Sequence, residues 1–410
     1  LTMACCKTLA FLSKYAEVVD YLAIMNIAKL VLYSMQTYKD GENVMYCAQV
    51  VMNTGSNEQC VGQWVQSETV QLLLRLCEEY IKKEETLFAL TAALYVLAKS
   101  EVSHASFGAG DCVSVFTSVL DVWMNRNNDE ILCNVLLTVF YCYKVEAVLA
   151  ALKRSTLLDL IIRVVVANLS KALAKAYAML MCRLAEDASL RPVLLAKRAL
   201  EPLLDCVRKF PKGKTVNADG FRAMELMSSE TEAKEFLLDN NVLYECMEAI
   251  KNHLYAVEVL LPAVDVIAII EQFAVEDGQT SAVKQRDICE YVVKAIVENG
   301  YEDRLLRAGL RALEFFIPFD EDGSLFYNND AVAVVIDSMG RLFEEEATQV
   351  TTLRVLKHTL LVPEASDIFN QNDGVKLATQ IAASFYASEA LQKEMMEVFV
   401  LLADAEELQS

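Results

Sequence analysis

Glycine and proline are scarce in this sequence, with 13 and 6 residues among 410. A fold built from many short strands needs more turn-forming residues, so the composition disfavours β-sandwiches and β-barrels. The sequence also lacks an unbroken apolar run of roughly 18 to 20 residues, the length that a membrane-spanning helix requires. Its longest candidate, Tyr21 to Met35, contains Asn26 and Lys29. Because 54% of the residues are nevertheless hydrophobic, we predict buried helices and no membrane span.

The sequence shows no targeting signal. It begins with Leu1, and no basic, apolar and cleavable leader follows, so we expect the chain to start partway through a longer protein. Its twelve cysteines are scattered through apolar stretches without a CxxC pair. We expect them to be buried thiols in a cytoplasmic protein, because a disulfide framework concentrates cysteines in a short, loop-rich chain.

Catalytic and cofactor motifs are missing as well. The three histidines, His104, His253 and His358, have no second metal ligand at helical spacing. The sequence contains none of the motifs of phosphate loops, dinucleotide sites, zinc proteases or hydrolase elbows. The acidic stretch from Asp320 to Gly323 resembles part of a calcium loop, but no carboxylate occupies its twelfth position, and we expect a solvated turn. We therefore predict a protein that is not an enzyme and uses no cofactor or metal.

A repeat is the main positive signal. Apolar or small residues at i, i+3, i+4 and i+7 mark one face of a helix, and this pattern begins nine times at intervals of 43 to 45 residues. A second apolar helix follows each start, and a short helix with a polar turn precedes it. The starts are Ile27, Val70, Val113, Leu157, Leu200, Leu243, Ile288, Val332 and Val375. Such units bury their apolar faces only by stacking on their neighbours.

Several of the last helices resemble a known family. Ala223–Met227 and Gly309–Leu313 are similar to the Ala-Leu-x-Ala-Leu pattern of armadillo repeats, and Cys5–Leu12 is similar at the start of the chain. The resemblance covers essentially the full length, with HEAT-like units as the alternative. It implies an all-α, right-handed superhelical solenoid of about nine three-helix repeats plus a truncated N-terminal one. We expect a single repeat domain over residues 1–410.

The last helix of each repeat would line a concave groove, which is the default binding surface of such a solenoid. Importin-type armadillo proteins hold extended basic peptides there on a ladder of Trp and Asn. At the matching positions this sequence has Lys7, Phe11, Gln49, Asn53, Met179, Arg183, Glu225, Ser229, Arg311, Phe315, Arg354 and His358. Only Asn53 keeps a ladder residue, and Trp64 and Trp123 lie outside these helices. We therefore predict a protein or peptide partner in the groove other than a nuclear import signal.

Charge is distributed unevenly along the chain. The net charge is −6 over residues 1–150, +7 over 151–220 and −21 over 221–410. The basic band at 151–220, which includes Arg183, Lys197 and Arg198, predicts a dock for an acidic segment, and solvated helix flanks are the alternative. Nucleic acid is disfavoured because the band lies within a negative chain and lacks an aromatic stacking ladder. The acidic C-terminal half would attract basic or amphipathic segments.

The sequence thus favours a non-enzymatic scaffold or adaptor that holds partner segments along its groove. Three alternatives stay open. A co-chaperone of the myosin-folding kind would bind an unfolded client. A cytoskeletal or axonemal subunit would bind microtubules, for which the basic band offers a contact to acidic tails. The chain would also suit the regulatory domain of a larger enzyme.

Overall fold

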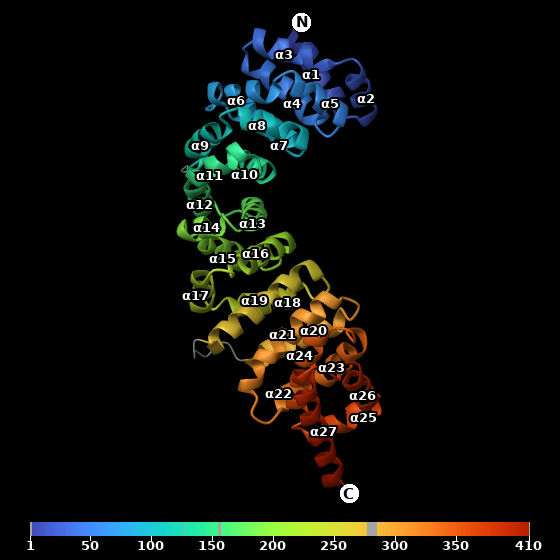
Figure 1. Cartoon of the computed structure of the whole chain (residues 1–410). Coiled ribbons are helices and arrows are strands. Elements are labelled where there is room, and N and C mark those ends of the chain that lie inside the picture. The colour runs from blue at the N-terminus through green and yellow to red at the C-terminus, as the bar shows by residue number, and fades with distance from the viewer. Residues whose placement is uncertain (1, 127, 155–156, 277–284, 410) are drawn as a thin grey trace. The chain divides into compact units, whose positions relative to one another are not determined.

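The computed structural model describes residues 2–126, 128–154, 157–276 and 285–409, and within these ranges every regular element is a helix (Figure 1). Contacts between Cα atoms divide the chain into two compact units, Leu1–Cys206 and Val207–Ser410. The all-α solenoid predicted from the sequence is confirmed. The number of repeats and the single domain over 1–410 stay predictions.

Helices recur in sets of three. The middle helices are α3 (Ile27–Thr37), α6 (Thr69–Glu79), α9 (Cys112–Trp123), α12 (Leu157–Ala167), α15 (Leu200–Lys209), α18 (Val242–Asn252), α20 (Gln285–Glu298), α23 (Ala331–Arg341) and α26 (Gly374–Ser384). Each begins within three residues of a start of the sequence repeat. Their apolar faces explain why these segments fold as helices that pack on neighbours.

A short first helix precedes most middle helices. These elements are α2 (Ala16–Ile24), α5 (Glu58–Gln66), η1 (Glu101–Ser103) with α8 (His104–Ala109), α11 (Glu146–Arg154), α14 (Arg191–Ala196), α17 (Thr231–Asp239), α22 (Ser324–Asn328) and α25 (Pro363–Gln371). A further short turn, η2 (Ile317–Phe319), follows one of the third helices.

Third helices complete the sets. In the first unit they are α1 (Thr2–Leu12), α4 (Gly41–Thr54), α7 (Glu84–Ala98), α10 (Asp129–Cys142) and α13 (Lys171–Ala185). In the second unit they are α16 (Lys214–Met227), α19 (Val257–Glu276), α21 (Asp303–Phe316), α24 (Glu346–Thr359) and α27 (Glu389–Gln409). Within each unit every third helix packs against the next one in the series (Figure 1).

The corner between first and middle helix has a recurring backbone conformation. One residue with a left-handed φ of 50 to 59° stands at six such corners: Asn26, Glu68, Arg198, Asn241, Asp330 and Asp373. At the first of them, α2 and α3 meet at an angle of 87°. The left-handed residue ends one helix and redirects the chain, as Asn and Asp do with little strain.

Polar groups connect successive sets across the core. The indole of Trp123 donates to the carbonyl of Ile81 at 2.7 Å, and the hydroxyl of Tyr80 donates to that of Lys39 at 2.9 Å. In the second unit, the amide of Asn299 donates to the carbonyl of Leu254 at 2.8 Å. Each bond spans 41 to 45 residues, so the buried donors help to fix the stacking register.

The apolar helices can be compared with the requirements of a membrane span. Among the described helices, none alone has the length and hydropathy needed to cross a membrane; two bent pairs, Ala16–Ile24 with Ala28–Thr37 and Glu84–Ala98 with Glu101–Ala109, meet that requirement by length and composition only. The cysteines are free thiols and most are buried, as expected, but Cys5 is exposed because it lies on the uncovered side of α1.

Candidate functional site

Third helices pack side by side in each unit, and they carry the partner-binding residues predicted from the sequence except Lys197, Arg198 and Ser229. In the first unit, Lys7 and Phe11 lie on α1. The Lys7 ammonium is 5.7 Å from the ring centroid of Tyr46, and Phe11, 57% exposed, packs edge-on to Tyr15. These side chains are accessible to a partner.

Gln49 and Asn53 lie on α4, and both are half-buried. The Asn53 amide donates to the carbonyl of Ala10 and to the hydroxyl of Ser13, each at 3.0 Å. Both donor hydrogens are thus used within the chain, so this ladder residue ties α4 to the end of α1.

Arg183 on α13 lies over aromatic rings. Its guanidinium carbon is 5.7 Å from the ring centroid of Phe140 and 5.6 Å from that of Tyr143, and it pairs with Glu186 at 2.7 Å. Two exposed cations, Lys171 and Lys175, lie one turn apart nearer the start of the same helix. This basic stripe of α13 is defined by Lys171, Lys175 and Arg183.

The other two basic residues expected in the same dock come from a different element. Lys197 and Arg198 lie at the corner between α14 and α15 rather than on α13. Each already has a carboxylate partner, Asp159 for Lys197 and Glu201 for Arg198. The structure therefore separates Arg183 from these two by element and supplies each with a counter-ion.

The second unit brings several predicted residues together. Glu225 of α16, Arg311 and Phe315 of α21 and Thr351 of α24 line a cavity of about 340 Å³. Asp265 of α19 also lines it. A neighbouring cavity of about 460 Å³ shares Asp265, Arg311 and Thr351, so the two hollows form one groove across four third helices. Ser229 does not line it; its hydroxyl donates to the carbonyl of Leu226 at 3.2 Å.

Charges of alternating sign run along this groove. Arg311 contacts Asp265 at 2.6 Å. The Arg311 side chain is 61% exposed, whereas the Asp265 side chain is only 14% exposed. Burial and the nearby Glu225 carboxylate raise the pKa of Asp265, and Arg311 opposes them; the resulting pKa is about 6.

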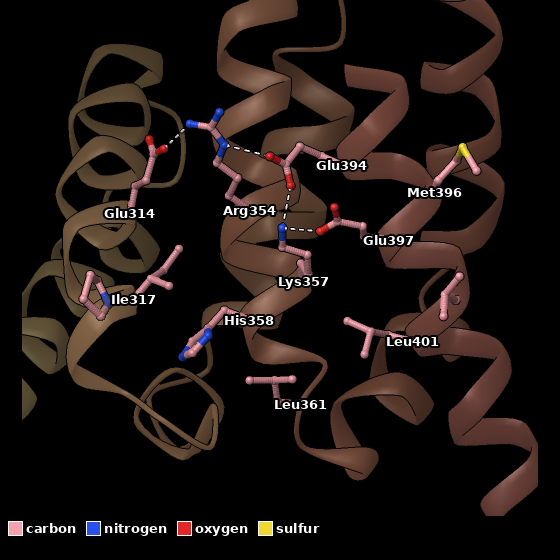
Figure 2. A pocket seen from close by; sticks show the side chains of 12 residues that line it. Glu314, Ile317, Arg354, Lys357, His358, Leu361, Glu394, Met396, Glu397 and Leu401 are labelled. Atoms are coloured by element: carbon pink, nitrogen blue, oxygen red, sulfur yellow. Dashed lines mark hydrogen bonds and ion pairs between the residues drawn. The ribbon is translucent and has the colours of Figure 1, made fainter. Parts of the chain in front are cut away.

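The series continues across α21, α24 and α27 (Figure 2). Arg354 contacts Glu314 at 2.5 Å and Glu394 at 3.1 Å, and Lys357 contacts Glu394 and Glu397, each at 2.7 Å. We call these five residues the charged wall. Burial opposes ionisation of Glu394, but hydrogen bonds from Lys357 and Arg354 outweigh it and lower the pKa below the ordinary value.

A larger cavity of about 770 Å³ lies beside the charged wall. Its remaining lining is mostly apolar and comes from η2, the end of α24 and α27: Ile317, Pro318, His358, Leu361, Met396, Val400 and Leu401. Figure 2 shows the wall along one side of the cavity and Ile317, Leu361 and Leu401 on the other. Its volume lies within the range of about 300–1,000 Å³ typical of ligand pockets.

The acidic turn beside this cavity is not the solvated turn expected from the sequence. Asp320 is only 4% exposed. Its carboxylate accepts hydrogen bonds from the backbone N–H groups of Leu325 at 3.0 Å and Phe326 at 3.3 Å, and lies 3.2 Å from His358 Nε2 without hydrogen-bond alignment. The prediction was wrong for Asp320 because its carboxylate caps α22, whereas Glu321 and Asp322 are exposed.

The remaining reactive residues serve packing. Nε2 of His104 lies 2.9 Å from the carbonyl of Ala98, and Nε2 of His253 lies 3.1 Å from that of Pro211. Burial raises the pKa of the Cys60 thiol to about 11 and that of Cys112 to about 12, so both stay protonated. A cluster of three or more potential metal ligands does not occur among residues that the structure describes.

Sequence reasoning missed half of the groove. Glu397 and Leu401 follow Arg354 and His358 by 43 residues, so one more period would have found them. Asp265 had no such signal, because α19 has 20 residues against 14 for its neighbours α16 and α21, which obscures the register. Glu314 and Glu394 are one turn away from the predicted positions and are identified only by their contacts.

Comparisons with known proteins support the fold alone. No protein-family model matches the sequence, and no curated protein matches it. A solved structure of β-catenin, from work on the phosphorylation switch that controls its interaction with cadherin, has a TM-score of 0.71 to this chain. The alignment covers 97% of this chain and 79% of the other at 11% sequence identity. The chain therefore has an armadillo-like helical fold.

Proposed function

We propose that this chain is a non-enzymatic scaffold that holds segments of partner proteins against the third-helix faces, with the groove of the second unit as the main contact. The 770 Å³ cavity carries the proposal. Its charged wall is paired internally, whereas its apolar side chains remain exposed, for example Met396 at 69% and Val400 at 57%. Apolar surface of this kind is characteristic of a binding site.

Site-specific photo-crosslinking tests this function. A photoreactive phenylalanine analogue replaces Phe315, which lines the groove, and in a second protein replaces Tyr244, which is 49% exposed on α18. Because both sites accept an aromatic side chain, neither substitution disturbs the core. We expect irradiation in cell extract to attach a distinct protein at 315 and not at 244, as read by mass spectrometry. Equal products from the two positions would contradict the groove as the contact.

A second contact, with an acidic segment, is favoured by the basic stripe of α13. Lys171 and Lys175 are exposed and make no ion pair with a described residue, unlike Lys197 and Arg198. Arg183 lies next to the half-buried ring of Phe140, which adds apolar contact to charge. We place the dock on α13, with Lys171 and Lys175 as its attracting charges, rather than at the α14–α15 corner. Charges that already have a partner, as Lys197, Arg198 and Arg183 do, contribute less to attraction.

The co-chaperone, cytoskeletal and regulatory-domain alternatives and the cytoplasmic location stay predictions. The crosslinking experiment separates the first two from a dedicated scaffold. A co-chaperone gives many unfolded clients at 315, and a cytoskeletal subunit gives tubulin. A dedicated scaffold gives one or few folded partners that recur between preparations.

A further inference from the structure

The side-chain rows along the third helices of the second unit change character at α27. One row, at intervals of 43 residues, reads Glu314, Lys357 and Val400. The adjacent row reads Phe315, His358 and Leu401. In the first row a carboxylate and an ammonium give way to Val400, and in the second row the imidazole of His358 gives way to Leu401. These two aliphatic residues of the last described helix contribute to the apolar part of the cavity.

Exposure shows that the apolar part is uncovered. Val400 is 57% exposed, and Met396, one turn earlier on the same helix, is 69% exposed. Leu361 lines the same cavity just beyond the end of α24 and is 45% exposed. Covering aliphatic surface of this size is favourable at roughly 25 cal/mol per Å², so the surface favours an apolar occupant.

The charge around the cavity favours an occupant that carries positive charge. The wall carries three carboxylates against the two cations Arg354 and Lys357. Both cations contact two carboxylates, and Glu397 keeps 45% of its side chain exposed. The unit as a whole, residues 207–410, has 18 basic and 36 acidic residues. An acidic segment is repelled here, and a basic one is attracted.

The polar groups that line the cavity also favour one secondary structure for the occupant. An extended peptide needs partners for its own N–H and C=O groups, which amide side chains in a groove provide. The polar groups that line this cavity are mainly the charged wall, whose members are engaged with one another. A helix satisfies its own backbone and presents apolar side chains at i, i+3, i+4 and i+7.

We infer that the cavity between α21, α24 and α27 binds a basic amphipathic helix of a partner protein, with its apolar face on Leu361, Val400 and Leu401 and its cations toward Glu397. The inference rests on the proposed scaffold function and specifies the partner at this one site.

A model peptide tests the inference in the intact chain. The probe is a fluorescein-labelled peptide of about 15 residues made of leucine and lysine, with leucine at helical spacing. Two control peptides have the same composition in scrambled order and the same pattern with glutamate in place of lysine. We expect fluorescence anisotropy to show binding of the patterned basic peptide and binding at least about tenfold weaker for the scrambled peptide. Any binding of the acidic peptide should come from the basic stripe of α13 and should not depend on the cavity.

Val400→Glu separates the cavity from non-specific attraction. If only the negative charge of the unit binds the peptide, the added carboxylate strengthens binding. If the apolar cavity binds it, burying a charge there weakens binding by about tenfold or more. Val166→Glu is the matched control, because Val166 is 64% exposed on α12, far from the cavity in sequence and in the other unit. We expect no loss for this variant, and circular dichroism checks that both variants fold.

Three outcomes overturn the inference: retained binding of the basic peptide by Val400→Glu, equal binding of the scrambled peptide, or binding of the acidic peptide that Val400→Glu weakens. None of them affects the crosslink at Phe315, so the scaffold function survives their occurrence. Conversely, if the crosslink at Phe315 is absent and the basic peptide still binds, the proposed scaffold function is rejected. The inference that the cavity binds a helix then still holds.

Discussion

Glu271 is a buried carboxylate without a counter-ion. It lies in α19, is 0% exposed, and neither carboxylate oxygen has a hydrogen-bond partner within the described part of the chain. Burial raises its pKa from the ordinary 4.5 to about 7. The folded state therefore binds this proton more tightly than the unfolded state does.

The pH dependence of stability follows from that pKa. The contribution of Glu271 is complete below pH 4.5 and is lost as the pH rises to 7. We expect Glu271→Gln to unfold at the same urea concentration as the native chain near pH 4.5. Above pH 7 the variant should be more stable by roughly 3 kcal/mol, from 1.36 kcal/mol per pKa unit.

The exposed Glu344 supplies the control for this experiment, since its side chain has no buried environment to lose. Glu344→Gln should follow the native curve at both pH values. A constant difference between Glu271→Gln and the native chain from pH 4.5 to 8 would show that the pKa of Glu271 is the same in the folded and unfolded states. Urea unfolding measured at each pH decides between the two results.

At the scale of single elements, the left-handed corners vary in how well their residue suits the backbone. Asn241, Asp330 and Asp373 have side chains that tolerate positive φ, whereas Glu68, with a φ of 55°, does not. We expect Glu68→Gly to raise the free energy of unfolding by about 0.5–1 kcal/mol, the strain relieved less the flexibility gained by the unfolded chain. Urea denaturation at pH 7 measures it.

Asn241→Gly is the comparison, because asparagine at a φ of 54° already has little strain. Its effect should be near zero or slightly destabilising. If Glu68→Gly raises the free energy of unfolding no more than Asn241→Gly does, the left-handed backbone of Glu68 is not strained.

The contact between α24 and α27 depends on one carboxylate more than on its neighbour. Glu394 joins Arg354 to Lys357 with 11% of its side chain exposed, while Glu397 contacts Lys357 alone at 45%. We expect Glu394→Gln to cost about 1–3 kcal/mol, as for a buried group that loses charged partners. Glu397→Gln should cost less than about 0.5 kcal/mol.

A pH titration provides an independent check of the same pair. The pKa of Glu394 is held below its ordinary value, so its stabilising contribution is present above that value and is lost as the pH falls through the lowered pKa. The native chain should lose more stability in acid than Glu394→Gln does. Parallel acid curves for the two proteins would count against an ionised bridge.

Periodicity predicted the elements better than it predicted the site. Leucine and valine at helical spacing fix a middle helix, because an apolar face must be buried whatever the neighbours are. Arg354 and Phe315 were found on the same spacing and do line the cavities. The spacing did not predict the pairing of Arg354 with Glu314 and Glu394, because an ion pair depends on which helices become neighbours and on how far each side chain is buried.

At the scale of the whole molecule, charge differs between the units. Residues 1–206 hold 19 basic and 21 acidic residues, so the first unit is almost neutral although the second is strongly acidic. We expect an acidic peptide of glutamate and phenylalanine to bind the intact chain through the basic stripe of α13. Binding should weaken as salt shortens the Debye length from about 10 Å at 0.1 M to about 3 Å at 1 M.

Double charge reversal locates that contact. Lys171→Glu with Lys175→Glu should slow association of the acidic peptide, as stopped-flow fluorescence measures, because exposed charges mainly steer encounter. Lys376→Glu with Lys393→Glu makes the same change in net charge at exposed positions of the second unit. Equal slowing by both pairs would indicate long-range repulsion and no dock on α13.

The shared corner conformation bears on how such a chain changes length over generations. A tandem duplication of 43 residues that begins and ends at equivalent corners rejoins the chain at a residue of the same φ, so the junction needs no new turn. The cavity beside α27 behaves differently, because it depends on Lys357 and Val400 occupying one row in consecutive repeats. Insertion of a copied repeat between α24 and α27 would move Lys357 and the charged wall away from the apolar lining residues Val400 and Leu401. Gain of a repeat therefore leaves the backbone of the corners unchanged, but it disrupts the cavity when the new repeat is inserted between α24 and α27.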